Sequence, residues 1–146
     1  MTCTRRDVLY TIGIATATAA LHTACGGDDG GDTGVPTGTA TMCGTNICFS
    51  LAANPELQAV GGIVFFSLAG KKIFVQKTDT GFLALSAICT HAGCTVAFNG
   101  SDQFNCPCHG SQFNAATGAV IFGPAVAPLP SFATSVNGDE VTITLA

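Results

Sequence analysis

From residue 42 onward the chain is a series of short apolar segments separated by turn residues. The segments are rich in Val, Ile, Phe and Leu, and Gly, Pro, Asn and Asp stand between them, a pattern typical of β-strands. No part of this region has a sustained helical periodicity. The expected strands span residues 47–52, 63–68, 72–77, 82–88, 95–98, 103–105, 111–114, 119–122, 133–136 and 140–145. We therefore predict an all-β domain over residues 42–146, built as a small antiparallel β-sandwich.

The first 25 residues have a different pattern, which is typical of an export signal. Arg5 and Arg6 precede an apolar run over residues 8–24, so a basic region is followed by a hydrophobic one. The arginine pair together with Leu9 resembles the twin-arginine motif, whose export route carries folded, cofactor-loaded proteins. We therefore expect the domain to lie outside the cytoplasmic membrane, on its periplasmic side.

Cys25 is the candidate point of attachment to the membrane. It follows a small residue, Ala24, at the end of the apolar run, as in a lipoprotein cleavage site, and a lipid on Cys25 would tether the domain. His22 stands where such a site has an aliphatic residue, so a second arrangement stays open. In that arrangement residues 8–24 remain as an uncleaved anchor, at the short limit for crossing a bilayer. Either arrangement tethers the domain to the outer face of the membrane.

Residues 26–41 consist mainly of Gly, Asp, Thr and Pro. A segment of this composition buries too little apolar surface to offset the entropy lost on ordering. We predict a flexible linker that gives the domain reach between partners.

Two short loops carry most of the cysteine and histidine of the domain. Residues 89–94 read Cys-Thr-His-Ala-Gly-Cys, and residues 106–111 read Cys-Pro-Cys-His-Gly-Ser. A zinc site also uses two cysteines and two histidines, but structural zinc ligands are usually paired with two to four residues between them, and the first loop has one. A domain held only by disulfides would give no role to His91 and His109.

Both loops resemble the Rieske 2Fe–2S iron–sulfur family, in its high-potential, disulfide-containing form. The resemblance implies one 2Fe–2S cluster, with Cys89 and Cys106 holding the inner iron and His91 and His109 the outer iron. It also implies the family's fold, a β-sandwich with an inserted cluster-binding subdomain. A Gly-Pro-Ala segment at residues 123–125, together with Pro128 and Leu129, resembles the proline-rich third loop that covers the cluster in this family.

The same resemblance assigns further residues around the cluster. Cys94 and Cys108 match the pair that high-potential members join as a disulfide across the two loops. Ser111 matches the serine whose hydroxyl donates to a cluster sulfur. Phe113 stands where those members carry a tyrosine that donates to a cysteine sulfur, so we expect a potential below the top of the Rieske range.

Cys43 and Cys48 remain outside this set. The four residues between them allow a small closed loop, and an exported domain favours oxidation, so we expect a second disulfide. A free thiol pair is the alternative.

The resemblance implies an electron carrier rather than a stand-alone catalyst. Its partners would be a membrane-bound quinol-oxidising protein and a cytochrome-type acceptor, as for the Rieske subunit of a quinol–cytochrome c oxidoreductase. Ala92 replaces the larger aliphatic residue usual in cytochrome bc complexes, which speaks against a partner of that type. One alternative is the small subunit of an exported molybdenum oxidase of the arsenite oxidase type. Another is a non-redox exported domain held together by a metal or by disulfides. The net charge of −4 and the absence of basic stripes exclude a nucleic-acid partner.

Overall fold

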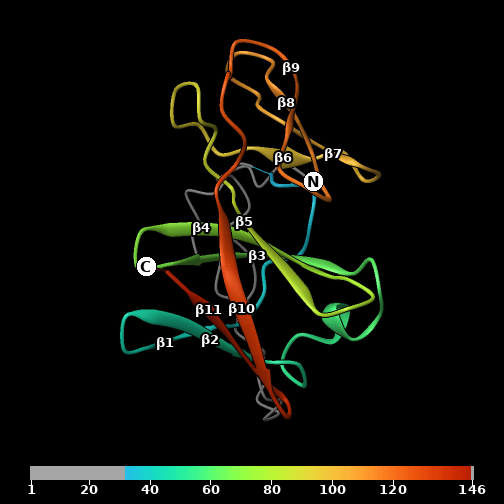
Figure 1. Ribbon diagram of the computed structural model, residues 1–146, viewed down its shortest axis with the longest axis vertical. Helices are drawn as coiled ribbons and strands as arrows, with labels where there is room; N and C mark the ends of the chain where they lie inside the picture. The colour runs from blue at the N-terminus through green and yellow to red at the C-terminus, as the bar shows by residue number, and fades with distance from the viewer. Residues whose placement is uncertain (1–31, 146) are drawn as a thin grey trace, which may run out of the picture.

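The computed structural model describes residues 32–145 and confirms the all-β prediction. The predicted export signal, the lipid site at Cys25 and the first part of the predicted linker lie outside the described residues. Two antiparallel sheets make up the fold (Figure 1). No helix among residues 32–145 is long and apolar enough to cross a membrane.

The larger sheet forms the base of the molecule, in the order β1-β2-β11-β10-β5-β4-β3. Strand β10 joins its two halves, because residues Ser131 and Phe132 pair with β5 and the rest of the strand pairs with β11. The bounds are β1 Thr41–Cys43, β2 Asn46–Ser50, β3 Ile63–Leu68, β4 Lys71–Lys77, β5 Phe82–Ser86, β10 Ser131–Asn137 and β11 Glu140–Thr144.

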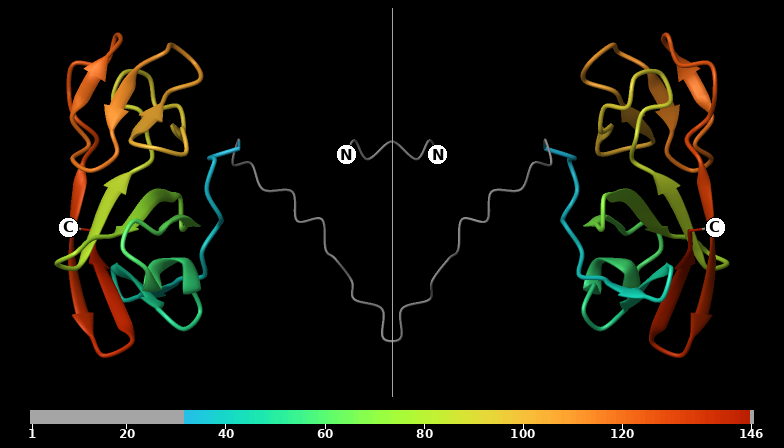
Figure 2. Two further views of the ribbon diagram at one scale, coloured as in Figure 1. Left: turned by 90° about the vertical axis from the view of Figure 1, so that its right-hand side faces the viewer. Right: turned by 90° about the vertical axis from the view of Figure 1, so that its left-hand side faces the viewer.

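The smaller sheet is inserted between β5 and β10 and carries the two cysteine–histidine loops. Its order is β6-β7-β8-β9, with β6 at Ala97–Phe98, β7 at Gln103–Asn105, β8 at Gln112–Asn114 and β9 at Val120–Phe122. The loop that follows β9 lies at one end of the molecule and the β10–β11 turn lies at the other (Figures 1 and 2).

Strands β3, β4 and β5 are covered on both faces, which explains their continuous apolar runs. Val64 and Phe66 point into a core shared with β2 and β11, and Phe65 points into a second core shared with the small sheet. Alternate side chains of a strand point to opposite faces, so neither face of β3 is left to water. Phe74 of β4 stacks on Phe104 of β7, with ring centroids 4.4 Å apart, and this contact joins the base to the small sheet.

The sequence pattern does not predict two short elements. Strand β1 has no counterpart among the expected strands, although only its first residue, Thr41, belongs to the predicted linker. A 3-10 helix, η1 at Pro55–Gln58, occupies the place of a simple turn. Each is defined by contacts rather than by its own composition: β1 pairs with β2, and Leu57 of η1 is fully buried.

The linker prediction for residues 26–41 is wrong at its carboxyl end. Residues 33–40 form an extended strap that runs from the small sheet to the base (Figure 2). The carbonyl of Thr33 accepts the Phe98 amide at 2.8 Å, and the Gly38 amide donates to the Phe65 carbonyl at 2.8 Å. Asn54, which is 1% exposed, receives the Thr39 amide at 2.7 Å. Two of the glycines that suggest a linker let the strap lie this close: a Cβ on Gly34 would meet the Phe98 backbone, and one on Gly38 would meet the Phe66 ring and the Asn54 amide oxygen.

Candidate metal centre

The two cysteine–histidine loops have the same backbone geometry. The Cys89 amide donates to the Cys94 carbonyl at 2.7 Å, and the Gly93 amide donates to the Cys89 carbonyl at 2.9 Å. The second loop repeats these bonds between Cys106, Gly110 and Ser111, at 2.7 and 2.9 Å. Gly93 and Gly110 have positive φ angles of 77° and 74°, a backbone conformation that residues with a side chain rarely adopt. Each loop is thus a closed turn that begins at a cysteine.

Thiols and imidazoles sit at different depths in these turns. Cys89 and Cys106 are each 2% exposed, whereas His91 and His109 are exposed. The two imidazole rings meet edge to face, with centroids 4.7 Å apart and planes at 81°. The site therefore has a dry thiol side and a wet imidazole side.

The surroundings of Cys89 favour its thiolate. Burial raises the pKa of this thiol, but hydrogen bonds from the backbone of His91 and Ala92 and contacts with the Cys106 and Ser111 side chains bring the net pKa below its usual value. A thiolate is the form that binds iron. Ser111 is fully buried and its hydroxyl oxygen accepts the Ala125 amide at 3.1 Å, which leaves the hydroxyl proton free to donate.

Both predicted disulfides are present. Cys94 and Cys108 join the two loops, and Cys43 and Cys48 close the β1–β2 hairpin. The sulfurs of Cys94, Cys106 and Cys108 lie within 4.8 Å of one another. Since two of these sulfurs are bonded to each other, the grouping is not a metal site of its own. It places the disulfide directly beside the Cys106 thiol, and Cys89 and Cys106 remain as the free cysteines of the described residues.

The third loop is fastened to both turns. The Thr90 hydroxyl donates to the Ala127 carbonyl at 2.6 Å, and a Cβ placed on Gly123 would be 2.5 Å from the Cα of Ser111. The Thr90 contact joins residues 37 positions apart and has no signal in the sequence. The resemblance at residues 123–125 predicted the covering loop but not the groups that hold it.

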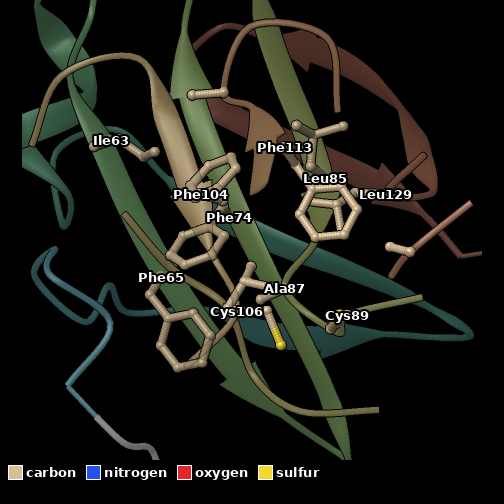
Figure 3. Packing of buried hydrophobic residues seen from close by; sticks show 13 residues of the cluster. Ile63, Phe65, Phe74, Leu85, Ala87, Cys89, Phe104, Cys106, Phe113 and Leu129 are labelled. Atoms are coloured by element: carbon tan, nitrogen blue, oxygen red, sulfur yellow. The ribbon is translucent and has the colours of Figure 1, made fainter. Parts of the chain in front are cut away.

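A phenylalanine core lies beneath the thiols (Figure 3). Phe113 is fully buried and Phe104 is 1% exposed, and both pack in one cluster with Cys89 and Cys106. Phe98 is half-buried against this cluster, 5.6 Å from the Phe104 ring. These rings keep water from the buried side of the site.

The donor set fits a mixed-ligand iron–sulfur cluster. Two buried cysteines, one of them with a lowered pKa, face one side and two exposed imidazoles face the other. An arrangement of two thiolates and two neutral imidazoles is what a Rieske centre requires.

Comparison with known proteins agrees with this geometry. Residues 48–133 match the family model of the Rieske [2Fe-2S] domain. The chain is 51% identical over 67 residues to the "Cytochrome b6-f complex iron-sulfur subunit" of Synechococcus sp. (strain JA-2-3B'a(2-13)), a match that covers 43% of this chain and 38% of that protein. It is 37% identical over 82 residues to the subunit of the same name from Chlorobaculum thiosulfatiphilum, covering 56% and 45%. The matches thus span less than half the length of these curated relatives.

Two solved structures share the fold. The "cyanobacterial plasma membrane Rieske protein PetC3" from Synechocystis PCC 6803 is 29% identical with a TM-score of 0.53, covering 70% of this chain and 99% of that one. A chain of the "Hyperthermophilic respiratory Complex III" is 25% identical with a TM-score of 0.51, covering 66% and 72%. Family and fold together identify the cofactor as a 2Fe–2S cluster, in place of zinc or disulfides alone. The chain belongs to the Rieske [2Fe–2S] family.

Proposed function

We propose that this protein carries single electrons from a membrane-bound quinol-oxidising partner to a cytochrome-type acceptor, on the outer side of the cytoplasmic membrane. The observation that carries the proposal is the exposed imidazole pair above the buried thiol pair. Cys89, Cys106, His91 and His109 would hold the cluster, which when bound supplies a one-electron acceptor.

The protein's own groups supply the rest of the chemistry. His91 and His109 are exposed at the surface, where the ring nitrogen that does not bind iron, once it has lost its proton, would accept a hydrogen bond from a donor's hydroxyl and take up its proton. Ser111 stabilises negative charge at the Cys89 sulfur. The core of Phe104 and Phe113 excludes water from the thiol side. Electron uptake is in this way coupled to proton uptake at the exposed side alone.

The location outside the cytoplasm rests on the amino-terminal pattern and on the disulfides. Arg5 and Arg6 before residues 8–24 support export, and Cys25 supports a lipid tether. Two disulfides in one small domain fit an oxidising compartment.

The relatives support a quinol-oxidising complex as the partner, since the curated ones are named as cytochrome b6-f subunits. A second candidate is the small Rieske subunit of an exported molybdenum oxidase. Ala92 favours this oxidase alternative. The residue is exposed between His91 and Gly93, so the first loop lacks a bulky aliphatic side chain that could pack against a cytochrome b-type partner.

The test is spectroscopic and kinetic. Purified protein should contain two irons and two acid-labile sulfides, give the low-average-g resonance of a Rieske centre when reduced, and accept electrons from a soluble quinol. His109→Cys should retain some cluster with a sharply lower potential, because a thiolate adds negative charge to the outer iron. An unchanged potential removes His109 from the ligands, and a reducible cluster that no quinol reduces argues for the oxidase alternative.

A further inference from the structure

Exposed apolar side chains gather beside the cluster site. Six large hydrophobic residues are exposed among residues 32–145, and three of them fall within six consecutive positions: Ile121, Phe122 and Val126. Phe122 is 67% exposed and Val126 is 96% exposed. We call the two most exposed of these, Phe122 and Val126, the apolar arm. Phe122 ends the edge strand β9 and Val126 lies in the third loop. The other three exposed hydrophobic residues are scattered over the base: Met42, Val60 and Val136.

The half of the molecule that carries the apolar arm is almost without charge. Between Asp79 and Asp139 the only Asp, Glu, Lys or Arg is Asp102. The remaining charged side chains of the described residues lie on the base or at the start of the strap. A surface of this kind has nothing to steer a charged partner and loses little solvation when it meets an apolar phase.

The apolar arm is held rigidly next to the imidazoles. The Thr90 hydroxyl, beside His91, donates to the Ala127 carbonyl. Gly123, between Phe122 and the third loop, packs on the backbone of Ser111. Whatever contacts the apolar arm therefore lies close to both imidazoles.

The strap fixes where the amino-terminal segment joins the head. The Thr33 carbonyl accepts the Phe98 amide of β6, so residue 33 lies at the small sheet and not at the base. Residues 25 to 32 can extend over about 24 Å at most. From β6 to β9 the small sheet measures about 14 Å across its three strand spacings, so a bilayer that holds residue 25 can also meet the apolar arm.

We propose that the apolar arm rests on the surface of a lipid bilayer, with the cluster-binding half held against the membrane by the amino-terminal tether. The inference builds on the membrane tether of the proposed function and adds an orientation and a contact surface. Phe122 and Val126, one aromatic and one aliphatic and both uncharged, suit shallow burial at the headgroup–acyl boundary. In this orientation the imidazoles stand at the level where a membrane-dissolved quinol is met.

The chain contains no tryptophan, so a single introduced indole reports its own surroundings. The full chain carrying Val126→Trp is reconstituted in neutral phosphatidylcholine vesicles with bromine on the acyl chains. We expect bromine to quench this indole strongly, and Phe122→Ser in the same chain to reduce the quenching. Val60→Trp, at a site 60% exposed on the base, is the matched control and should keep its emission.

Every other outcome overturns the contact. Equal quenching at 126 and 60, no quenching at 126, or failure of the chain to associate with vesicles contradicts it directly. Emission at 126 that responds only to added membranes from the source cells assigns the apolar arm to a protein partner, and a lipid-independent blue shift that grows with protein concentration assigns it to a second copy. The Rieske resonance recorded on each sample separates this inference from the proposed function: a normal resonance without quenching sinks the membrane contact alone.

Discussion

Gly34 lies directly against the backbone of Phe98: a Cβ placed on Gly34 would be 2.3 Å from the Phe98 carbonyl oxygen. The contact closes the strap onto the small sheet and covers the open edge of β6. At its other end the strap covers β3, where the Phe65 amide donates to the Pro36 carbonyl at 2.9 Å. One segment thus protects two sheet edges and ties the cluster-binding half to the base.

Gly34→Ala should detach the strap from the small sheet. Gly34 has a φ of +72° and Gly44 has +67°, so alanine at either position costs about 1–2 kcal/mol in backbone strain. Only Gly34 adds a clash, since nothing lies within 4 Å of a Cβ on Gly44. We expect Gly34→Ala to lower the Tm several degrees more than Gly44→Ala, measured by circular dichroism, and to lower the temperature at which the cluster's visible absorption is lost. Equal effects would mean that the strap is dispensable.

The strap also marks where sequence reasoning ends. The strand over residues 63–68 has its expected bounds, because a mainly apolar run lies between Gly62 and the turn at Ala69 and Gly70. For residues 33–40 the pattern predicts a linker, since Gly and Thr carry no apolar periodicity. What orders this segment is its backbone hydrogen bonds and its close approach to both sheets, which leave no mark on the pattern. The spacing of the two cysteine–histidine loops predicts the kinds of ligand. The hydrogen bond from Thr90 to Ala127 cannot be predicted in this way, because it depends on the fold bringing distant residues together.

Thr90→Val should loosen the third loop without disturbing the fold. Valine keeps the shape of the side chain but removes the donor to the Ala127 carbonyl, a loss of about 0.5–1.5 kcal/mol. We expect faster exchange of the Ala125, Val126 and Ala127 amides and faster loss of the cluster in air. Thr134→Val is the control, because the Thr134 hydroxyl donates to the Phe82 carbonyl within the base at 2.8 Å. A loop that exchanges no faster than in the parent protein would show that Gly123 and Ser111 hold it unaided.

Cys94→Ser should still allow the cluster to assemble with its full iron content, but the assembled cluster should be less stable. The disulfide to Cys108 closes a loop across 14 positions, and such a link stabilises the folded state by about 3 kcal/mol. Without it the two ligand turns are joined only through the small sheet and the third loop. We expect a lower potential and faster bleaching of the reduced protein, followed by visible spectroscopy. The double variant Cys43→Ser, Cys48→Ser removes the other disulfide, far from the ligands, and should change stability with an unaltered potential; a shift there would mean that the base sets the potential.

Phe113→Tyr tests how the buried side of the site sets the potential. Phe113 is fully buried in the hydrophobic core that also contains Cys89 and Cys106. A hydroxyl added to its ring therefore meets either a ligand sulfur or apolar side chains. A hydrogen bond to a charged sulfur is worth about 1.5–3 kcal/mol and strengthens as negative charge grows on reduction. The difference between the two states should raise the potential by some tens of millivolts, since about 59 mV corresponds to a tenfold change in a one-electron equilibrium. Protein-film voltammetry gives the potential, and thermal unfolding gives the stability of the same samples.

Phe104→Tyr is the control, because Phe104 pairs with Phe113 across the strands and stacks on Phe74. It should cost stability, through an unsatisfied hydroxyl, and leave the potential in place. A loss of stability without a potential shift in both variants would show that the Phe113 ring points into the core, and that the potential is set by Ser111 and the backbone amides alone.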